Sequence, residues 1–215
     1  MSKHLDRLRD EHKDFELNAL GDAFEKDPFV AFQEWFDAAC SAEQPEPNAV
    51  VLSTAEVQGC QPSSRVLYLK ELRRGAFVFY TNYESNKASE MDKNRKVSLL
   101  FFWPGQQRQI RIQGTVEKIP SSESDAYFQS RPRSSQLGAW ASDQSRPLKS
   151  RAELEQKLKA LEQKFPDRVE RPEFWGGYCV IPVKFEFWQG RPSRLHDRIV
   201  FEWTKEGWNT FRINP

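Results

Sequence analysis

Hydroxyl and basic side chains gather in the segment SRPRSSQ (130–136), which Tyr127 precedes. Tyr127 and Arg131 are four residues apart, so on a helix they share a face. Ser134 and Ser135 then stand where a second helix would begin, near its free backbone N–H groups. This combination of a phenol, a guanidinium and hydroxyls suits a phosphate group. A solvated helix end with capping serines explains the same residues, and the local pattern by itself favours that simpler interpretation.

A second basic segment is RLHDR (194–198). In an extended chain alternate residues share a side, so Arg194, His196 and Arg198 present three basic groups on one face. Such a cluster could bind a carboxylate, a phosphate or a phenolate, or stabilise negative charge on a reduced flavin ring. An edge strand with solvated charges, partly paired with Asp197, is an equally good interpretation.

A third pattern is the strand-like run QIRIQ (109–113), in which Gln109, Arg111 and Gln113 share one face. The amide of Gln109 could hydrogen-bond the edge of a heterocycle. A half-exposed strand is the favoured interpretation of this run alone.

A fourth set of basic and hydroxyl groups lies at predicted strand ends, in RVLYLK (65–70), at Tyr80 and Thr81, and in SNK (85–87). These groups suit a phosphate clamp if the segments converge. Trp188 could cover a ring or fill the core.

The composition narrows the class of protein. The 215 residues include 32 Lys and Arg against 31 Asp and Glu, which argues against a general nucleic-acid or membrane binder. The three cysteines are scattered, and the histidines at 4, 12 and 196 lack metal-ligand spacing, so we expect no disulfide framework and no metal. No Gly-rich phosphate loop follows a strand. With no apolar leader or membrane-spanning run, a cytoplasmic protein is expected.

The elements that must position these residues begin with a helix. Residues 1–26 form a polar arm, and Asp27 with Pro28 predicts a capped helix start. Phe32 and Trp35 lie on its buried stripe.

Eight short runs rich in β-branched and aromatic residues then predict the strands of a fold with about seven short strands. They are AVVLSTAEV (49–57), SRVLYLKEL (64–72), AFVFYTN (76–82), KVSLLFFW (96–103), QRQIRIQGTVEKI (107–119), GGYCVIPVKFEFWQG (176–190), RIVFEWTK (198–205) and WNTFRI (208–213). Residues 85–94 predict a short helix, and a helical insert at about 120–166 ends in a helix that Ser150 and Glu153 cap. We therefore predict a mainly β fold with peripheral helices, an antiparallel barrel, in one domain over 27–215.

Taken together, the segments resemble the pyridoxamine 5′-phosphate oxidase family. The matching stretches are RVLYLK (65–70), FYTN (79–82), SNK (85–87), RQIRIQG (108–114), YFQSRPRSSQLGAW (127–140), QS (144–145), WGGY (175–178) and EFWQGRPSRLHDR (186–198). They run in the family's order and cover the chain from about Asp27 to the end.

The resemblance implies an FMN-binding split β-barrel, antiparallel and Greek-key-like, that forms a homodimer with FMN in clefts between the subunits. It implies oxidation of pyridoxamine 5′-phosphate or pyridoxine 5′-phosphate to pyridoxal 5′-phosphate, with hydride transfer from C4′ to flavin N5. Molecular oxygen would reoxidise the flavin and yield hydrogen peroxide.

The resemblance also implies a role for individual residues. The residues that would contact FMN are Arg65, Val66, Leu67, Tyr68, Leu69, Lys70, Tyr80, Thr81, Asn86, Lys87, Gln109, Gln144, Ser145, Trp188 and Arg198. The substrate phosphate would be held by Lys70, Tyr127, Arg131 and Ser135. Arg194, Leu195 and His196 would contact the rest of the substrate, with Arg194 and His196 over the pyridine ring as candidate catalytic residues.

The chain departs from the family at a few positions. Asn86 stands where the family usually has Arg, which removes one charge from the FMN-phosphate clamp at a cost of about 1.5–3 kcal/mol if nothing compensates. Residues 9–12 (RDEH) fall where some members carry a substrate-covering Arg-Arg-Glu-Tyr segment.

Two other functions are compatible with the same residues. One is a split-barrel flavoenzyme that oxidises another heterocycle, and the other is a non-catalytic protein that binds flavin or pyridoxal phosphate. A substrate screen separates the first from the predicted oxidase, and flavin reduction by substrate separates the second.

Overall fold

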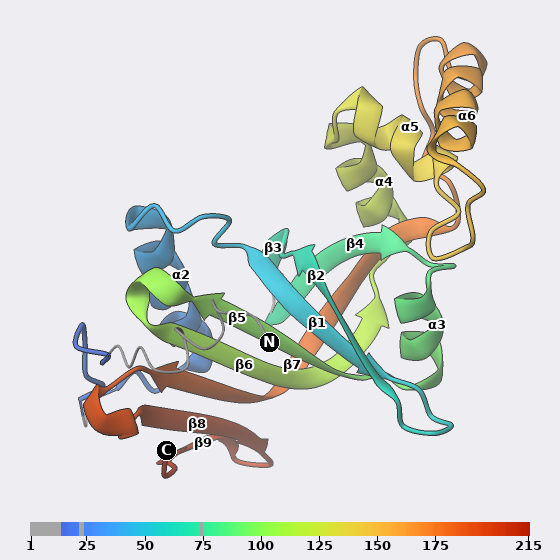
Figure 1. Ribbon diagram of the computed structural model, residues 1–215. Coiled ribbons are helices and arrows are strands. Elements are labelled where there is room, and N and C mark those ends of the chain that lie inside the picture. The colour runs from blue at the N-terminus through green and yellow to red at the C-terminus, as the bar shows by residue number, and fades with distance from the viewer. Residues whose placement is uncertain (1–13, 22–23, 74) are drawn as a thin grey trace, which may run out of the picture. The chain divides into compact units, whose positions relative to one another are not determined.

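The computed structural model describes residues 14–21, 24–73 and 75–215 (Figure 1). The chain divides into two compact units. Unit 1 comprises residues 1–48, 100–112 and 183–215, and unit 2 comprises residues 49–99 and 113–182. Each unit is therefore built from segments far apart in the sequence. The single domain over 27–215 stays a prediction.

Nine strands in the described residues form one sheet, in the order β2-β1-β5-β6-β7-β4-β3, with β8 on β7 and β9 on β8. They are β1 (Ala49–Ala55), β2 (Pro62–Tyr68), β3 (Glu71–Arg73), β4 (Ala76–Asn82), β5 (Lys96–Trp103), β6 (Arg108–Lys118), β7 (Trp175–Gln189), β8 (Asp197–Thr204) and β9 (Gly207–Arg212). The pairs β1–β2, β3–β4, β4–β7, β7–β8 and β8–β9 are antiparallel. The predicted mainly β class with peripheral helices is confirmed.

The predicted strand over 64–72 is wrong in one respect, because the structure splits it in two. β2 pairs with β1, whereas β3 pairs with β4. Leu69 and Lys70 connect the two, and the backbone N–H of Lys70 donates to the carbonyl of Val78 at 2.9 Å. The periodicity is continuous through the break because both strands are extended, so only the pairing partners reveal it. Lys70 thereby leaves the ladder of β2 at an exposed turn.

Unit 2 carries four helices in its described residues. They are α3 (Asn86–Lys93), α4 (Ser121–Ser130), α5 (Arg133–Ala141) and α6 (Arg151–Lys164). The last three lie together in Figure 1, around a small core of Phe128, Leu137, Val169 and Trp175. Pro132 separates α4 from α5 because its ring cannot continue a helix. As predicted, Ser150 caps α6 by accepting from the N–H of Glu153.

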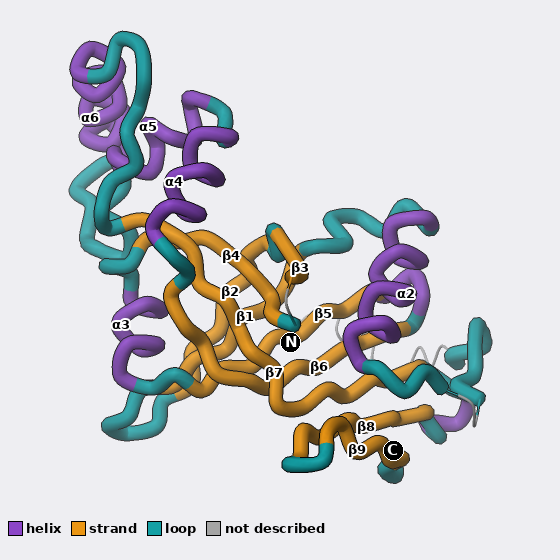
Figure 2. The backbone as a smooth tube through the Cα atoms, turned by 180° about the vertical axis from the view of Figure 1, so that it is seen from behind, coloured by secondary structure: helices purple, strands orange, loops and turns teal. Residues whose placement is uncertain are grey.

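Unit 1 contains α2 (Pro28–Ser41) and the antiparallel strands β8 and β9. These two strands lie side by side in Figure 2. The predicted cap is present, since Asp27 accepts from the N–H groups of Phe29 and Val30. The buried stripe of α2 packs on aromatic residues of the sheet, with Trp35 and Phe187 rings 5.2 Å apart. No helix within the described residues has the length and apolar character needed to cross a bilayer.

Candidate active site

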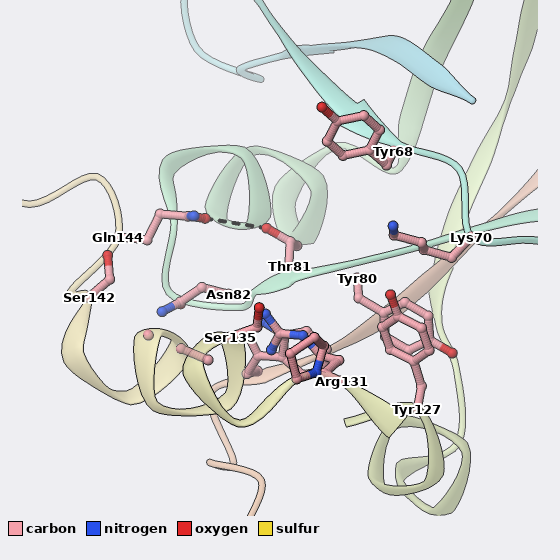
Figure 3. Close-up of a pocket in the computed structure, with 14 residues that line it drawn as sticks. Tyr68, Lys70, Tyr80, Thr81, Asn82, Tyr127, Arg131, Ser135, Ser142 and Gln144 are labelled. Carbon is pink, nitrogen blue, oxygen red and sulfur yellow. Dashed lines mark hydrogen bonds between the residues drawn. The ribbon is translucent and has the colours of Figure 1, made fainter. Parts of the chain in front are cut away.

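A pocket of about 650 Å³ opens in unit 2, between strand ends and the helical insert (Figure 3). Its walls come from the end of β2 and the link to β3, strand β4, helices α4 and α5, the loop after α5, and the start of β7. The lining residues are Tyr68, Lys70, Tyr80, Thr81, Asn82, Tyr127, Arg131, Pro132, Ser135, Gly138, Ala139, Ser142, Gln144 and Trp175. The pocket therefore brings together Lys70, Tyr127, Arg131 and Ser135, the four residues expected to hold the substrate phosphate.

Helix α4 and the residue that follows it position two of these residues. Tyr127 lies in the last turn of α4, and Arg131 is the residue that ends the helix in an extended conformation. The Tyr127 ring stacks on Tyr80 of β4, with ring centres 3.8 Å apart and planes at 15°. The Arg131 guanidinium lies over the ring of Trp175, 4.5 Å from its centre. Aromatic packing thus orients both polar groups.

Arg131 carries a hydrogen-bond donor that the described part of the chain leaves unused. Its Nη1 is buried and has no hydrogen-bond partner among the described residues. Burial lowers the pKa of this guanidinium, while the same burial raises the pKa of the Tyr127 phenol. A buried donor without a partner is costly unless a ligand satisfies it. The charge and the free donor make this pocket suited to an anion.

A second basic group, Lys87 in the first turn of α3, lies near the same pocket. Its Nζ donates to the hydroxyls of Thr81 and Ser85, both at 3.1 Å, and to Oε1 of Gln144 at 2.7 Å. Burial, and then the charge of Arg65, lower the pKa of Lys87 to about 8. Two cations are therefore close enough to repel each other, an arrangement that an anion would relieve.

The predicted phosphate ligand Arg65 is already engaged by its own unit. Its guanidinium donates to Oγ1 of Thr54 at 2.5 Å and forms an ion pair with Glu90 at 3.4 Å. Burial raises the pKa of Glu90, but hydrogen bonds from Thr54 and Ser63 and the charge of Arg65 lower it overall. The carboxylate is therefore ionised and offsets much of the charge of Arg65.

The neighbouring helix terminus is open. The side chain of Ser85, the N-cap of α3, does not cap the helix but donates to the carbonyl of Asn82 at 2.7 Å. Asn86 is the first residue of the helix and is exposed. The free N–H groups of this terminus add positive potential next to Lys87.

The remaining predicted residues of unit 2 do not line the pocket. Val66 is exposed, Leu67 is half-buried and Leu69 is buried. Ser145 follows Gln144 in the loop after α5 and has a positive φ of 69°.

Six predicted residues belong to unit 1: Gln109, Trp188, Arg194, Leu195, His196 and Arg198. The rings of Trp188 and His196 are 4.7 Å apart, and Leu195 is 70% exposed. Arg194 has a left-handed φ of 61° in the turn before it. Residues 9–12 lie outside the described part of the chain.

Arg198 is held by an ion pair and hydrogen bonds within unit 1. Its Nη2 pairs with buried Glu186 at 2.8 Å, and the other oxygen of that carboxylate accepts from Arg111 at 3.1 Å. Arg198 also donates to the carbonyl of Asn214 at 2.9 Å. One edge of a second pocket, of about 450 Å³, is formed by His196, Asp197 and Arg198.

Sequence reasoning missed several residues that line the first pocket. These are Asn82, Pro132, Gly138, Ala139, Ser142 and Trp175. All but Ser142 lie inside motifs that had been singled out, in FYTN, SRPRSSQLGAW and WGGY. The motifs could therefore have pointed to these residues. Trp175 and the small residues were missed because they carry no charge that would mark them as ligand contacts.

The fold is that of a split β-barrel protein, and its pocket is lined by the basic side chains of Lys70 and Arg131. A family profile described as pyridoxamine 5′-phosphate oxidase matches residues 36–165. A second, described as the pyridoxine 5′-phosphate oxidase C-terminal dimerisation region, matches residues 175–215. The chain belongs to the pyridoxamine 5′-phosphate oxidase family.

Relatives and solved structures agree with this assignment. The pyridoxine/pyridoxamine 5′-phosphate oxidase of Bordetella pertussis is 50% identical over 189 residues, which cover 87% of this chain and 89% of that protein. A similar solved structure is that of PhzG from Burkholderia lata, in complex with tetrahydrophenazine-1-carboxylic acid. Its sequence is 28% identical to this chain, and the two structures superpose with a TM-score of 0.87. It covers 93% of this chain and 99% of that one.

A third likeness concerns the fold alone. A pyridoxamine 5′-phosphate oxidase-related, FMN binding protein from Nostoc punctiforme is 17% identical with a TM-score of 0.72. The match covers 89% of this chain and all of that one, 100%. The predicted split-barrel fold is confirmed.

Proposed function

We propose that this protein oxidises pyridoxamine 5′-phosphate or pyridoxine 5′-phosphate to pyridoxal 5′-phosphate, with FMN as cofactor and molecular oxygen as the final acceptor. The observation that carries the proposal is the pocket that gathers Lys70, Tyr127, Arg131 and Ser135 in a chain of this family. The name of the Bordetella relative, half of whose matched residues are shared, supports the same reaction.

The substrate phosphate binds in the pocket of unit 2. The free Nη1 of Arg131 and the ammonium of Lys70 supply charge, and the hydroxyls of Tyr127 and Ser135 supply further donors. Holding the phosphate at one end of the substrate limits the positions of the reacting carbon at the other end. The Trp175 ring covers one face of the Arg131 guanidinium and keeps water away from that face.

The residues around the start of α3 fit the phosphate of FMN. Lys87, the Thr81 hydroxyl and the open N–H groups of the helix offer the donors that a phosphate monoester requires. Asn86 adds no charge there, so Lys87 is the main cationic contact, with Arg65 partly neutralised by Glu90.

The other FMN contacts we assign are in both units. They are residues 65–70, Tyr80, Asn86, Gln109, Gln144, Ser145, Trp188 and Arg198, some of them from a second copy of the chain. When bound, FMN supplies the acceptor for a hydride from C4′ of the substrate, and its reoxidation by oxygen yields hydrogen peroxide. Arg194, Leu195 and His196 contact the pyridine portion of the substrate. For the amine substrate, water then hydrolyses the imine product to the aldehyde.

Two copies of the chain form the working enzyme in this proposal. The match of residues 175–215 to a dimerisation region supports a homodimer. The three cysteines are free in the structure, which fits a reducing, cytoplasmic location.

An absorbance spectrum tests the proposal. Purified protein, loaded with FMN if necessary, should be yellow, and anaerobic pyridoxamine 5′-phosphate should bleach the flavin band. This anaerobic step should release one pyridoxal phosphate per flavin reduced. Admitting oxygen should then restore the band and form one hydrogen peroxide per flavin reoxidised. A protein that cannot be loaded with FMN, or whose flavin stays oxidised with either B6 substrate, contradicts the proposal.

The likeness to PhzG makes another heterocycle a second candidate substrate. The four phosphate-binding residues of the pocket favour a phosphorylated substrate over a carboxylated tricycle. Parallel anaerobic reductions with pyridoxamine 5′-phosphate, unphosphorylated pyridoxamine and tetrahydrophenazine-1-carboxylic acid decide between them. Reduction only by the last would replace the proposed substrate.

A further inference from the structure

The imidazole of His196 is held by its own chain in a way that selects one protonation state. The backbone N–H of Arg191 donates to Nδ1 of His196 at 3.1 Å. An N–H donor requires a lone pair on the nitrogen it approaches, so Nδ1 carries no proton. The single proton of the neutral imidazole is then on Nε2. Nε2 has no hydrogen-bond partner among the described residues of the chain.

Two aromatic rings contact the imidazole of His196. Trp188 lies 4.7 Å away at 46°, and Phe15 lies 5.5 Å away at 72°, an edge-to-face contact. Phe15 also contacts Trp188 edge-on at 5.7 Å. A Cβ on Gly190 would come within 2.7 Å of the Phe15 ring, so only glycine allows this close approach. The ring of His196 therefore has little freedom to turn and exchange its two nitrogens.

Phe15 belongs to the segment 14–21, which hydrogen bonds hold on this loop. Asp14 accepts from the N–H of Ser193 at 3.1 Å, and the N–H of Leu20 donates to Asp197 at 3.0 Å. The carbonyl of Asn18 accepts from Arg191 at 2.9 Å. These hydrogen bonds attach the segment 14–21 to residues 191–197, and they support the contact of Phe15 with His196.

The charges around His196 also disfavour its protonated form. Burial, and then the positive charge of Arg194, lower the pKa of His196. Protonation would in addition place an N–H on Nδ1 directly against the N–H of Arg191, two donors facing each other.

The neighbouring carboxylates are committed elsewhere. Asp197 accepts from Arg212 at 3.2 Å and pairs with Arg191 at 3.5 Å, and Asp14 is bound to the loop backbone. Arg198, which lines the second pocket with His196, adds a further positive charge that is paired with Glu186.

We propose that His196 acts as a neutral hydrogen-bond donor through Nε2–H, and that Phe15 and the main chain of Arg191 are positioning residues that maintain this tautomer. His196 then donates to an acceptor atom of the substrate and does not take up the substrate's proton. The catalytic part of this inference rests on the proposed function, whereas the protonation state does not.

Nuclear magnetic resonance of the imidazole nitrogens tests the tautomer directly. The chain has only three histidines, so His4→Gln with His12→Gln leaves His196 as the single signal in ¹⁵N-labelled protein. We expect a bare Nδ1 and a protonated Nε2 at neutral pH, with titration only below the ordinary pKa of about 6.5. A proton on Nδ1, or a pKa at or above the ordinary value, overturns the proposal whether or not the enzyme oxidises vitamin B6.

The positioning role of Phe15 is tested in the same background. Phe15→Ala should raise the pKa of His196 towards its ordinary value and populate both tautomers. The matched control is Phe29→Ala, which removes a ring that contacts Phe185 and Trp208 in the same unit. An unchanged His196 spectrum in Phe15→Ala contradicts the role of Phe15.

Activity separates a donor from a base. His196→Gln keeps an N–H donor but no basic nitrogen, whereas His196→Leu has neither. If His196 is a donor, the Gln variant should keep at least about tenfold more kcat/KM than the Leu variant, a difference of about 1.4 kcal/mol. The decrease of kcat/KM at low pH should also be the same in the Gln variant as in the wild type. Equal loss in both variants overturns the donor role.

Discussion

At the scale of single residues, Lys87 combines burial with three hydrogen-bond acceptors around one ammonium group. Its lowered pKa of about 8 means that its charge is lost within an accessible pH range. The protonated form attracts a phosphate, so affinity for FMN is complete below this pKa and falls as the pH rises through it.

We therefore expect FMN to bind about tenfold more weakly for each pH unit above 8, until the pKa of the complex is reached. Quenching of FMN fluorescence on titration with apoprotein measures this dependence. Lys87→Arg is the control, because its guanidinium stays charged and should remove the slope. A slope that persists in Lys87→Arg would assign the effect to another group.

Arg131 provides a second residue-scale prediction, because its Nη1 has no partner among the residues that the structure describes. Lys in its place keeps the charge but loses the planar fork that can hold a phosphate with two hydrogen bonds. Arg131→Lys should raise KM for pyridoxamine 5′-phosphate about tenfold or more, with a smaller effect on kcat.

The matched control for Arg131→Lys is Arg133→Lys, two residues further along the chain. Arg133 donates to the carbonyls of Phe165 and Asp167 and does not line the pocket. Steady-state kinetics on both variants decide the matter. Equal KM values for the two variants would exclude Arg131 from phosphate binding.

At the scale of elements, two glycines of unit 2 have opposite steric surroundings. A Cβ on Gly114 of β6 would lie 2.3 Å from the carbonyl oxygen of Ile181 on β7, whereas one on Gly138 of α5 meets nothing within 4 Å. The first glycine permits close strand pairing, and the second only weakens a helix.

Gly114→Ala should therefore lower the free energy of unfolding by about 1–3 kcal/mol, because a backbone carbonyl must move. Gly138→Ala should raise it by about 0.5–1 kcal/mol through helix propensity. Urea denaturation of both variants without ligand measures the difference. A Gly114→Ala protein as stable as the wild type would show that the strands separate without cost at this point.

At the scale of the whole molecule, a ligand that binds only the folded protein stabilises it by mass action. FMN at about 100 times its Kd should add about 2.7 kcal/mol to the free energy of unfolding. This corresponds to a rise in Tm of about 5–10 °C for a chain of this length.

Riboflavin at the same concentration is the control, because it has the ring system but no phosphate. Differential scanning calorimetry of the apoprotein with each ligand should show a much smaller shift with riboflavin. Equal shifts would mean that Lys87 and the start of α3 do not hold a phosphate.

The sequence by itself determined the features that depend on neighbouring residues. The caps at Asp27 and Ser150 are present as predicted, because a cap needs only a side chain and the N–H groups of the next turn. Tyr127 lies in the last turn of a helix as predicted, although Arg131, four residues on, follows that helix in an extended conformation. The ordered motifs were sufficient to indicate the family.

Only the tertiary structure decided which distant residues meet. It separated β2 from β3, placed the indole of Trp175 against Arg131, and paired Arg65 with Glu90. It also directed the N–H of Arg191 at His196 and so selected a tautomer. Caps and periodicity act over a few residues, whereas burial, ion pairing and strand partners depend on segments that only the folded chain brings into contact.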